Sequence, residues 1–403
     1  MSGSLEGLKV IDCGVWIVAP GAAAILGDLG ADVIKVEPVT EGDPARGTVD
    51  IALAQISGKA TRNYIFEYAD RNKRSITLNL KKDKGKEILY KLVEKSDVFV
   101  HNYRPDAMKR LGMDYETLSS HNPQLIYGCA SAWGLKGPDS QQPGMDQATT
   151  ARAGLMYMAG EPGAPPVHFV TGLSDQAGAV VFTLAILAAL LARERQKVGQ
   201  QVSVSALGSV MCLESMAITY RLLHGEEFPR RSRLKMGNPL WNYYQCADGK
   251  WLILAMQQAD RYWSAFCKVM GIEHLEKDAK FDNMQVRAKN AEELTAILDQ
   301  RFGTKPREEW LRLLLKEDLI TQPIQTISEV VADPQALAND NIIDYEHPTY
   351  GATKMIGFPY EFSRGSPSVR RPAPELGQHT EEVLLEMGYT WDDIVELKNQ
   401  GVI

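Results

Sequence analysis

The first third of the chain alternates short apolar runs with longer segments that carry apolar residues on one side only. The short runs predict strands at 8–12, 31–36, 75–80, 97–100 and 124–127, and the longer segments predict helices that include 20–29 and 84–95. The run 31–36 is rich in β-branched residues, as expected for a strand covered on both faces. Strand–helix alternation of this kind predicts an α/β fold with a parallel sheet and right-handed crossovers.

One long apolar stretch, residues 177–192, contains no charged residue and is closed by Arg193-Glu194-Arg195. It is shorter than the roughly 20 residues that a membrane span needs. We therefore predict a fully buried core helix, followed by a strand at 201–205, and no membrane association.

The pattern changes after residue 225. A basic, loop-like segment leads into two β runs, 241–245 and 251–256, joined by the turn Ala247-Asp248-Gly249-Lys250. Such a turn between two β runs is typical of a hairpin. Helices are predicted at 260–270, 291–302 and 306–316, and two shorter ones near the C-terminus at 380–387 and 391–399. This part of the chain therefore predicts a second, smaller α+β unit.

The composition narrows the function classes. A chain of 403 residues favours two domains, and the net charge of −7 with scattered basic residues argues against nucleic acid as a partner. The seven histidines have no metal-ligand spacing, so no metal site is predicted. The five cysteines form no C-x-x-C pair, and no signal peptide is expected at the N-terminus, which together predict a cytoplasmic protein with reduced thiols.

The usual phosphate-binding and nucleophile motifs are absent: the sequence has no G-x-G-x-x-G after the first strand, no G-x-x-x-x-G-K-[ST] and no G-x-S-x-G. Attention therefore moves to carboxylates at loop–helix junctions. Asp175 lies at the mouth of the long apolar helix, just after Gly172. On local sequence alone, a helix N-cap is the commoner role for such a residue. The alternative is a nucleophile whose charge is held by the helix N-terminus.

Several stretches decide between these two roles: 5–10, 29–37, 72–76, 97–102, 110–112, 187–190 and 371–380. In their order and spacing they resemble the class III CoA-transferase family, the formyl-CoA transferase and carnitine CoA-transferase group. The resemblance covers most of the chain. It implies a Rossmann-like large domain of residues 1–225, a small α+β domain of residues 226–330, and a linker with a C-terminal return to the large domain in residues 331–403.

The resemblance also implies an intertwined homodimer in which each chain threads through its partner, and a heteromer with a related subunit stays open. It implies no permanently bound cofactor, with an acyl-CoA thioester and a carboxylic acid as substrates. Asp175 matches the family's nucleophile and Asp146 matches its second active-site acid, although a cap for a helix that opens at Gln147 is the alternative for Asp146. The residues matched to CoA contacts are Leu78, Asn79, Leu80, Lys81, Asn102, Tyr103, Arg104 and Arg110.

This chain departs from the family at three places. Pro38 stands where the family commonly has a phosphate-binding Arg, so another residue must supply that contact. Val15-Trp16-Ile17-Val18 replaces the first loop of the oxalate-using members, which contains a Gln, and Lys235-Met236-Gly237-Asn238-Pro239 replaces their run of glycines. We expect a more apolar pocket in which Ile17 and Val18 contact the substrate and which does not suit formate or oxalate. Trp16 could equally be an ordinary core residue.

Two competing functions remain to be weighed. The related α-methylacyl-CoA racemases pair their Asp with a His, but this chain has Met145 there, which cannot carry a proton and is expected to line the CoA site. A catalytically silent CoA-binding subunit is less consistent with the retained Asp175 and Asp146. Segments 165–166, 171–173, 175–178 and 237–239 are similar to the 2-hydroxy acid branch, so the predicted acceptor is a 2-hydroxy acid or an aryl or branched acid.

Overall fold

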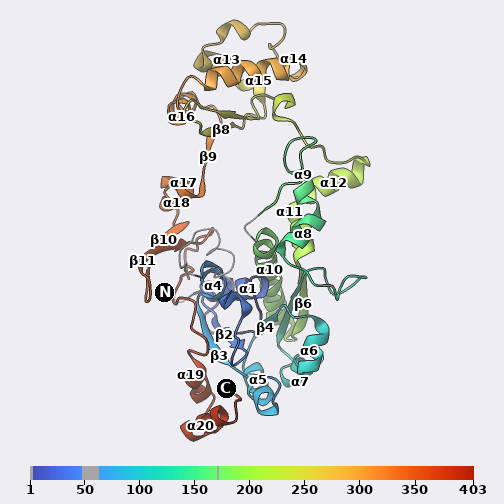
Figure 1. Cartoon of the computed structure of the whole chain (residues 1–403), viewed down its shortest axis with the longest axis vertical. Helices are drawn as coiled ribbons and strands as arrows, with labels where there is room; N and C mark the ends of the chain where they lie inside the picture. Colours follow the sequence, from blue (N-terminus) through green and yellow to red (C-terminus); the bar gives the residue numbers. More distant parts are fainter. Residues whose placement is uncertain (1–2, 48–62, 170–171) are drawn as a thin grey trace.

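The structure, a computed structural model, describes residues 3–47, 63–169 and 172–403. Thr171, part of one segment similar to the 2-hydroxy acid branch, lies outside the described residues. The molecule is elongated, with a sheet and its helices at one end and a smaller, mostly helical part at the other (Figure 1). The C-terminus lies at the end that holds the sheet.

Six parallel strands form the large sheet in the order β3-β2-β1-β4-β5-β6. Their bounds are β1 Lys9–Asp12, β2 Asp32–Glu37, β3 Lys73–Thr77, β4 Val98–His101, β5 Ile126–Ser131 and β6 Gln200–Ser205. This is the order of doubly wound Rossmann-like folds, in which the chain reverses direction across the sheet between β1 and β4. The predicted α/β class with a parallel sheet is confirmed.

One predicted strand is wrong at its end. The sequence predicts a strand over 75–80, but β3 stops at Thr77. The next residues leave the sheet to meet the C-terminus of the chain, where the Asn79 N–H donates to the carbonyl of Val402 at 2.7 Å. A contact between residues more than 300 positions apart leaves no trace in the local pattern.

Two apolar cores lie on the two faces of the sheet. On one face, α1 (Val18–Asp28) and α10 (Leu173–Gln196) cover strand residues such as Val33 and Val100. On the other face lie α5 (Asp83–Glu94), α7 (Tyr115–His121) and the two C-terminal helices α19 (Thr380–Glu386) and α20 (Trp391–Asn399). The last helices therefore complete the core of the sheet rather than form a separate unit.

The smaller part has its own core, which includes Tyr244, Phe266 and Trp310. Its antiparallel sheet contains β7 (Tyr243–Gln245), β8 (Trp251–Leu254) and β9 (Thr321–Ile324), with Pro323 hiding β9 from a sequence-based prediction. The helices that pack here are α13 (Ala259–Met270), α14 (Met284–Lys289), α15 (Ala291–Phe302) and α16 (Arg307–Lys316). The predicted hairpin and its three helices are thus present.

Several short elements were not predicted, because a helix of one or two turns shows too little periodicity. They include α4 (Tyr64–Asp70), α6 (Pro105–Leu111), α9 (Leu155–Met158), α11 (Ala206–Leu213), α12 (Ser215–His224), α17 (Ile327–Val330), α18 (Pro334–Ala338) and the hairpin of β10 (Ile342–His347) with β11 (Gly351–Ile356). The helix expected to open at Gln147 is present as α8 (Asp146–Ala153).

Helices α1 and α10 approach each other closely because glycines face the contact. A Cβ on Gly178 would lie 3.1 Å from the Val18 side chain, and one on Gly21 would lie 3.1 Å from the Cβ of Ala179. The Thr183 hydroxyl, also buried here, donates to the carbonyl of Ala179. This packing fixes the start of α10, which carries Asp175, beside the loop that precedes α1.

The outer side of α10 differs from the prediction. The inner face is buried, as expected of a core helix, but Val180, Leu184 and Leu191 are each more than half exposed in the single chain. Among the described residues, α10 is long and apolar enough to span a membrane by length and composition, as is the bent pair α11 and α12 taken together. Because α10 packs on α1, α8, α11 and the sheet, it is a core helix of the protein.

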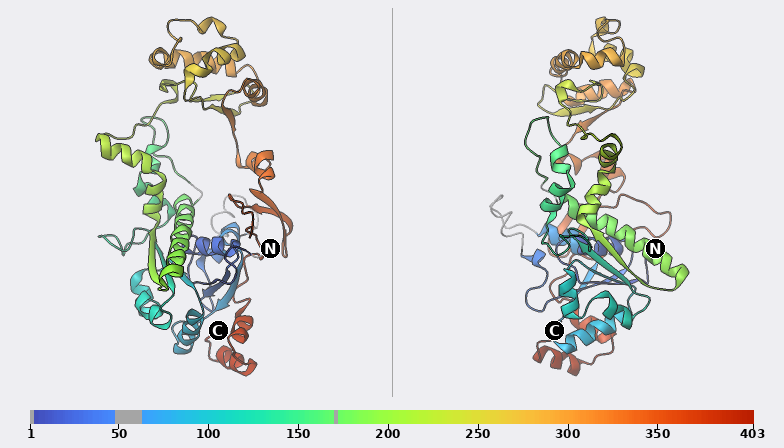
Figure 2. Two further views of the ribbon diagram at one scale, coloured as in Figure 1. Left: turned by 180° about the vertical axis from the view of Figure 1, so that it is seen from behind. Right: turned by 90° about the vertical axis from the view of Figure 1, so that its right-hand side faces the viewer.

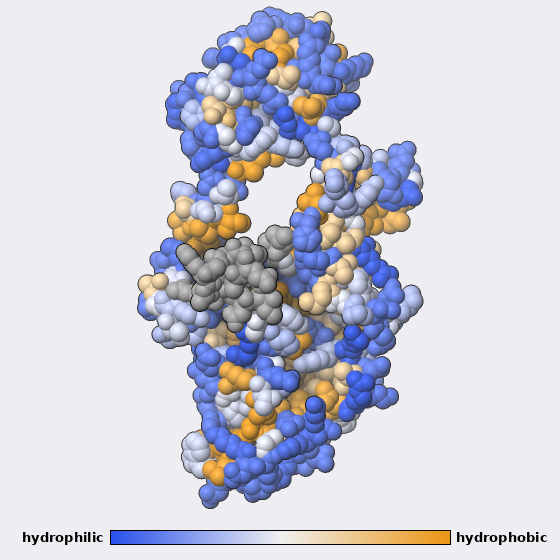
Figure 3. All heavy atoms as spheres, viewed as in Figure 1, coloured by the Kyte–Doolittle hydropathy of each residue, from blue (hydrophilic) through white to orange (hydrophobic). Residues whose placement is uncertain are grey.

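The chain encloses an opening between the sheet end and the small end (Figure 2). In the space-filling view this opening passes through the molecule, and apolar side chains gather along its border (Figure 3). Strongly exposed apolar residues include Ile327 of α17, which lies beside the opening, and Met216, Leu222 and Leu223 of α12, which projects away from it (Figure 1). Such a concentration of exposed apolar surface is unusual for a solitary chain.

Replacing Phe182 with Ala tests the packing of α10. The Phe182 ring is fully buried and so close to Gly128 of β5 that a Cβ there would lie 2.7 Å from it. We expect Phe182→Ala to lower the free energy of unfolding by about 3–5 kcal/mol in urea denaturation, because it leaves a cavity against the sheet. The control Phe228→Ala removes a ring that is 42% exposed and is expected to lower it by less than about 1 kcal/mol. Equal losses would contradict this packing.

Candidate active site

A cavity of about 110 Å³ lies at the carboxyl edge of the large sheet. Its walls come from the loops that follow β1, β4, β5 and β6, together with the starts of α8 and α10. The residues that line it are Trp16, Ile17, Val18, Asn102, Ser131, Ala132, Gly144, Met145, Thr149, Asp175 and Ala206. The carboxyl ends of the strands, beside the point where the strand order reverses, are where doubly wound sheets bind ligands.

Among the described residues that line this cavity, Asp175 alone carries a carboxylate. Helix α10 begins at Leu173 after Gly172, so Asp175 lies within the first turn and is not the N-cap residue. Among the described residues, no group donates a hydrogen bond to its carboxylate oxygens. Burial, and then the negative charge of Asp146, raise the pKa of Asp175 to about 7. A carboxylate this poorly stabilised is a stronger base and nucleophile than an ordinary aspartate.

Asp146 takes the hydrogen bonds that Asp175 lacks. Its Oδ1 accepts from the Ser174 N–H at 2.7 Å, from the Ser174 hydroxyl at 2.9 Å and from the Asp175 N–H at 3.3 Å. The alternative that Asp146 caps its own helix is wrong, because α8 begins at Asp146 and Met145 occupies the cap position. Asp146 instead caps the neighbouring helix α10, from a position 28 residues away in the sequence.

The starts of α8 and α10 therefore converge. The hydroxyls of Thr149 and Ser174 lie 2.6 Å apart and join the first turns of the two helices. Two helix N-termini bring partial positive charge to the same place, which favours negative charge there. The arrangement can support oxyanions that form during attack on a carbonyl at Asp175.

The first loop, between β1 and α1, is held by hydrogen bonds at three consecutive residues. Gly14 N–H donates to Asp12 Oδ1 at 2.7 Å, and Asn102 binds both the N–H and the carbonyl of Val15, at 2.9 and 2.7 Å. The Trp16 N–H donates to Asp43 Oδ1 at 3.1 Å. Trp16 has φ 65°, a left-handed conformation that costs a non-glycine residue about 1–2 kcal/mol. These contacts hold Trp16 and its neighbours against the cavity.

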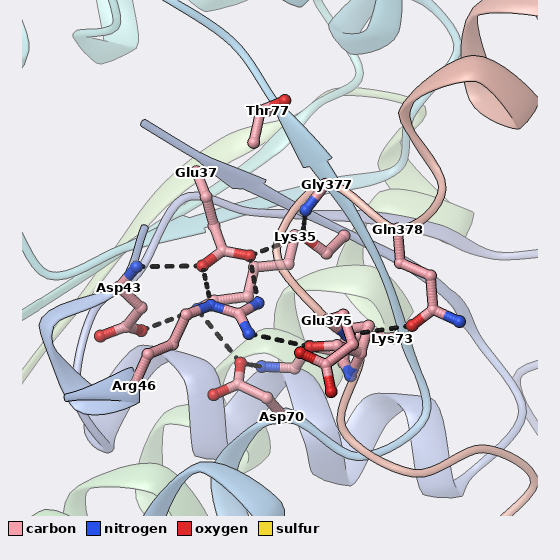
Figure 4. A network of polar contacts seen from close by, with 12 residues as sticks. Lys35, Glu37, Asp43, Arg46, Asp70, Lys73, Thr77, Glu375, Gly377 and Gln378 are labelled. Carbon is pink, nitrogen blue, oxygen red and sulfur yellow. Dashed lines mark hydrogen bonds and ion pairs between the residues drawn. The ribbon is translucent and has the colours of Figure 1, made fainter. Parts of the chain in front are cut away.

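Behind this loop lies a buried ion network, in which Lys35, Asp43, Asp70 and Lys73 point toward one another (Figure 4). Lys35 Nζ lies 2.9 Å from Asp43 and 3.1 Å from Asp70, and all three side chains are 0% exposed. Burial alone would lower the pKa of Lys35, but the surrounding carboxylates raise it well above its usual value. Lys35 also donates to the Gly14 carbonyl at 3.2 Å, so the network is tied directly to the first loop.

A second cavity, of about 370 Å³, lies on the same edge of the sheet beyond Asn102. It is lined by Tyr103, Arg104, Asp106, Ala107, Arg110 and Gln141. Both arginines are exposed, and within the described part of the chain neither forms an ion pair with a carboxylate. Free guanidinium groups of this kind suit phosphate. The structure thus brings together three of the residues that the sequence matched to CoA contacts.

The other matched segment, Leu78 to Lys81, follows β3 on the same edge. Leu78 is buried in the core, and the Asn79 side chain donates to the Gly401 carbonyl and accepts from the Lys81 N–H. Lys81 is exposed. The segment therefore lies where the prediction needs it, although Leu78 and Asn79 already serve to bind the C-terminus. Pro38 begins a turn in which its carbonyl accepts from Gly42 N–H.

Five of the residues predicted from the sequence meet at the Asp175 cavity: Asp175, Ile17, Val18, Asn102 and Met145. Sequence reasoning missed the contributions made at the carboxyl ends of β5 and β6, where Ser131, Ala132 and Ala206 line the cavity. No recognisable sequence motif marks these three residues. The rule that ligands bind at the carboxyl ends of parallel strands was the signal that could have found them.

A poorly stabilised carboxylate at the edge of a doubly wound sheet, with exposed arginines beyond it, is the arrangement expected of an enzyme that acts on a phosphate-bearing substrate. The family model described as CoA-transferase family III matches residues 5–380. The chain is similar to a (R)-2-hydroxy-4-methylpentanoate CoA-transferase of Clostridioides difficile (33% identical, covering 99% of both chains). It is also similar to the human succinyl-CoA:glutarate CoA-transferase (32% identical, covering 99% of this chain and 90% of that one).

Among solved structures, a CAIB/BAIF family protein from Brucella suis superposes with a TM-score of 0.85 at 28% identity, covering 96% of this chain and 100% of that chain. This chain belongs to CoA-transferase family III. It is a class III CoA-transferase, an enzyme that acts on acyl-CoA substrates.

Asp175 and Asp146 are expected to affect stability in opposite directions. The pKa of Asp175 is about 7 in the folded chain and lower when unfolded, so its stabilising contribution is present at low pH and is lost as the pH rises through 7. We expect Asp175→Asn to raise the free energy of unfolding by about 2 kcal/mol at pH 8. This is less than the free energy that corresponds to the full pKa difference, because Asp175 is partly exposed. Asp146→Ala removes the cap of α10 and should lower it by about 1–2 kcal/mol.

Urea denaturation at pH 8 and pH 5 measures both effects. The gain from Asp175→Asn should shrink at pH 5, where the native Asp175 is already protonated. A gain that is equal at both pH values, or a loss at pH 8, would contradict the raised pKa.

Proposed function

We propose that this enzyme moves CoA from an acyl-CoA thioester to a carboxylic acid through covalent intermediates on Asp175. The observation that carries the proposal is the Asp175 carboxylate itself: it lines an apolar cavity, accepts no hydrogen bond from the described residues, and has a pKa near 7. At neutral pH a substantial fraction is ionised while remaining reactive.

The proposed reaction has four balanced steps. The Asp175 carboxylate attacks the donor thioester, which forms a mixed anhydride and releases CoA thiolate. The thiolate attacks the aspartyl carbonyl, which forms an aspartyl-CoA thioester and frees the donor acid. The acceptor carboxylate then displaces the thiolate in a second anhydride, and the thiolate attacks the acceptor carbonyl to give the new acyl-CoA and free Asp175.

Other residues have supporting parts in the proposal. The converging starts of α8 and α10 stabilise the oxyanions, and Asp146 keeps the first turn of α10 in place. The pantetheine passes Asn102, and Arg104 and Arg110 bind phosphate in the second cavity, with Lys81 further along the same edge. The small apolar cavity keeps water from the anhydrides.

For the acceptor, we propose a 2-hydroxy acid or an aryl or branched carboxylic acid. The walls formed by Trp16, Ile17, Val18, Met145 and Ala206 offer apolar surface and few hydrogen-bond donors. The similar protein from Clostridioides difficile, whose name gives a branched 2-hydroxy acid as its substrate, supports this choice.

For the assembly, we propose an interlocked homodimer in which each chain passes through the opening of the other. The opening seen in Figure 3 and the exposed apolar residues along its border support this arrangement. The exposed outer face of α10 would then also be covered.

Isotope transfer tests the role of Asp175. When the acceptor acid carries ¹⁸O in its carboxylate, the last step leaves one of these oxygens on the nucleophile. We expect a gain of about 2 Da in the tryptic peptide 153–193, which contains Asp175, after one turnover, and a gain that approaches about 4 Da over many turnovers, because the oxygen that attacks the donor leaves with the donor acid. The tryptic peptide 137–152, which contains Asp146, is the internal control and should stay unlabelled.

Asp175→Ala should abolish both transfer and label while leaving the fold intact. Turnover without label in peptide 153–193 would refute the covalent role. The same reaction in heavy water distinguishes the racemase alternative: deuterium at the α-carbon of the acyl group would favour it, and we expect none because Met145 cannot carry a proton.

Subunit exchange tests the interlocked dimer. Native mass spectrometry should give twice the mass of one chain, and mixed tagged and untagged dimers should form no hybrids until they are unfolded and refolded together, because linked chains cannot separate while folded. A monomer mass, rapid exchange, or co-purification only with a different subunit would contradict the proposal.

A further inference from the structure

Trp16 is an unexpected residue at its position in the backbone. Its φ of 65° lies in the left-handed region, where glycine is the residue without steric cost. This position nevertheless carries tryptophan, the largest amino-acid side chain, in the wall of the cavity that contains Asp175. A bulky residue kept at a strained position beside a reactive group points to a use for its ring.

The left-handed backbone conformation of Trp16 is stabilised by groups that do not line the cavity. Asp43 accepts from the Trp16 N–H and from the Ala45 N–H through the same oxygen, Oδ1. Its other oxygen, Oδ2, binds the fully buried Lys35 at 2.9 Å. Asp43 is not among the residues that line the cavity, so any influence on substrate must pass through the first loop.

Asp43 is itself fixed from two further sides. Its N–H donates to Glu37 Oε1 at 3.0 Å, and Glu37 is held in turn by Arg46. Lys35 also forms an ion pair with Asp70 and donates a hydrogen bond to the Gly14 carbonyl. The ends of β1 and β2 and the loop after β2 therefore fix Asp43, and Asp43 fixes Trp16.

We propose that Trp16 is a specificity-determining residue that limits the size of the acid accepted beside Asp175, and that Asp43 is the positioning residue that holds it there. The inference rests on the proposed transfer reaction. With the ring in place, the cavity beside Asp175 is only about 110 Å³. Among the acceptors proposed above, Trp16 therefore favours the short and branched acids over the aryl acids. Removing the ring, or releasing its backbone, widens the space.

The experiment compares two acceptor acids, propionate and 3-phenylpropionate, with one acyl-CoA donor in the full-length enzyme. The measured quantity is the ratio of kcat/KM for the phenyl acid to that for propionate. We expect Trp16→Ala to raise this ratio by about tenfold or more, since pocket size alone discriminates by such factors. Trp16→Phe retains a ring and should give a smaller change.

A double-mutant cycle separates positioning from simple loss of stability. We expect Asp43→Asn alone to raise the ratio, and Asp43→Asn added to Trp16→Ala to raise it no further, because the ring it positions is already gone. The matched control Asp28→Asn breaks another buried ion pair, with Arg71, at the far end of α1. Asp28→Asn should lower the stability of the enzyme without changing the ratio. A second control, Trp391→Ala on the exposed surface of α20, should change neither the stability nor the ratio.

The outcomes distinguish this inference from the proposed function. If the wild-type enzyme transfers CoA with ¹⁸O label on Asp175 and Trp16→Ala leaves the ratio within about twofold, the inference fails while the function stands. A lower ratio in Trp16→Ala, or an equal change in Asp28→Asn, would also overturn it. If the wild-type enzyme transfers no CoA to any acid, the proposed function fails first.

Discussion

The hydrogen bonds from the start of α10 to Asp146 are the interaction on which the site depends. Because Asp146 takes the free N–H groups of Ser174 and Asp175, the first turn of α10 is satisfied by a carboxylate from another helix. Among the described residues none donates a hydrogen bond to the Asp175 carboxylate, and burial, followed by the negative charge of Asp146, raises its pKa to about 7. Two neighbouring aspartates thus differ in their roles because of their surroundings: Asp146 accepts the hydrogen bonds, and Asp175 keeps a reactive carboxylate.

The doubly wound sheet provides the cavity that lies beside this pair. Reversal of the strand order between β1 and β4 opens space between the two loops that follow them, and Asn102 bridges that space to Val15. The exposed arginines after β4 lie on the same edge. An elongated molecule with a thiol at one end and phosphates at the other suits such an edge, which is the physical link between this fold and the family's substrate.

Beneath the edge, a cluster of fully buried lysines and aspartates supports the first loop. Breaking a buried pair of this kind costs about 3–5 kcal/mol, so the contacts that tie the network to Gly14 and Trp16 are costly to disrupt in the folded domain. In the proposed reaction, such support would keep the anhydride from water and align it with the thiolate. The strained Trp16 is tolerated because the contacts around it outweigh its steric cost.

Local pattern was enough to predict the parallel sheet, the long helix and the helices of the small part, because alternation and periodicity come from neighbours in the sequence. Resemblance added Asp175 and the arginines after β4. Tertiary structure alone decided that Asp146 caps α10 rather than α8, that β3 ends early to meet Val402, and that Trp16 takes a left-handed conformation in the cavity wall. Each of these depends on a partner distant in the sequence, and such pairings form only when the chain is packed.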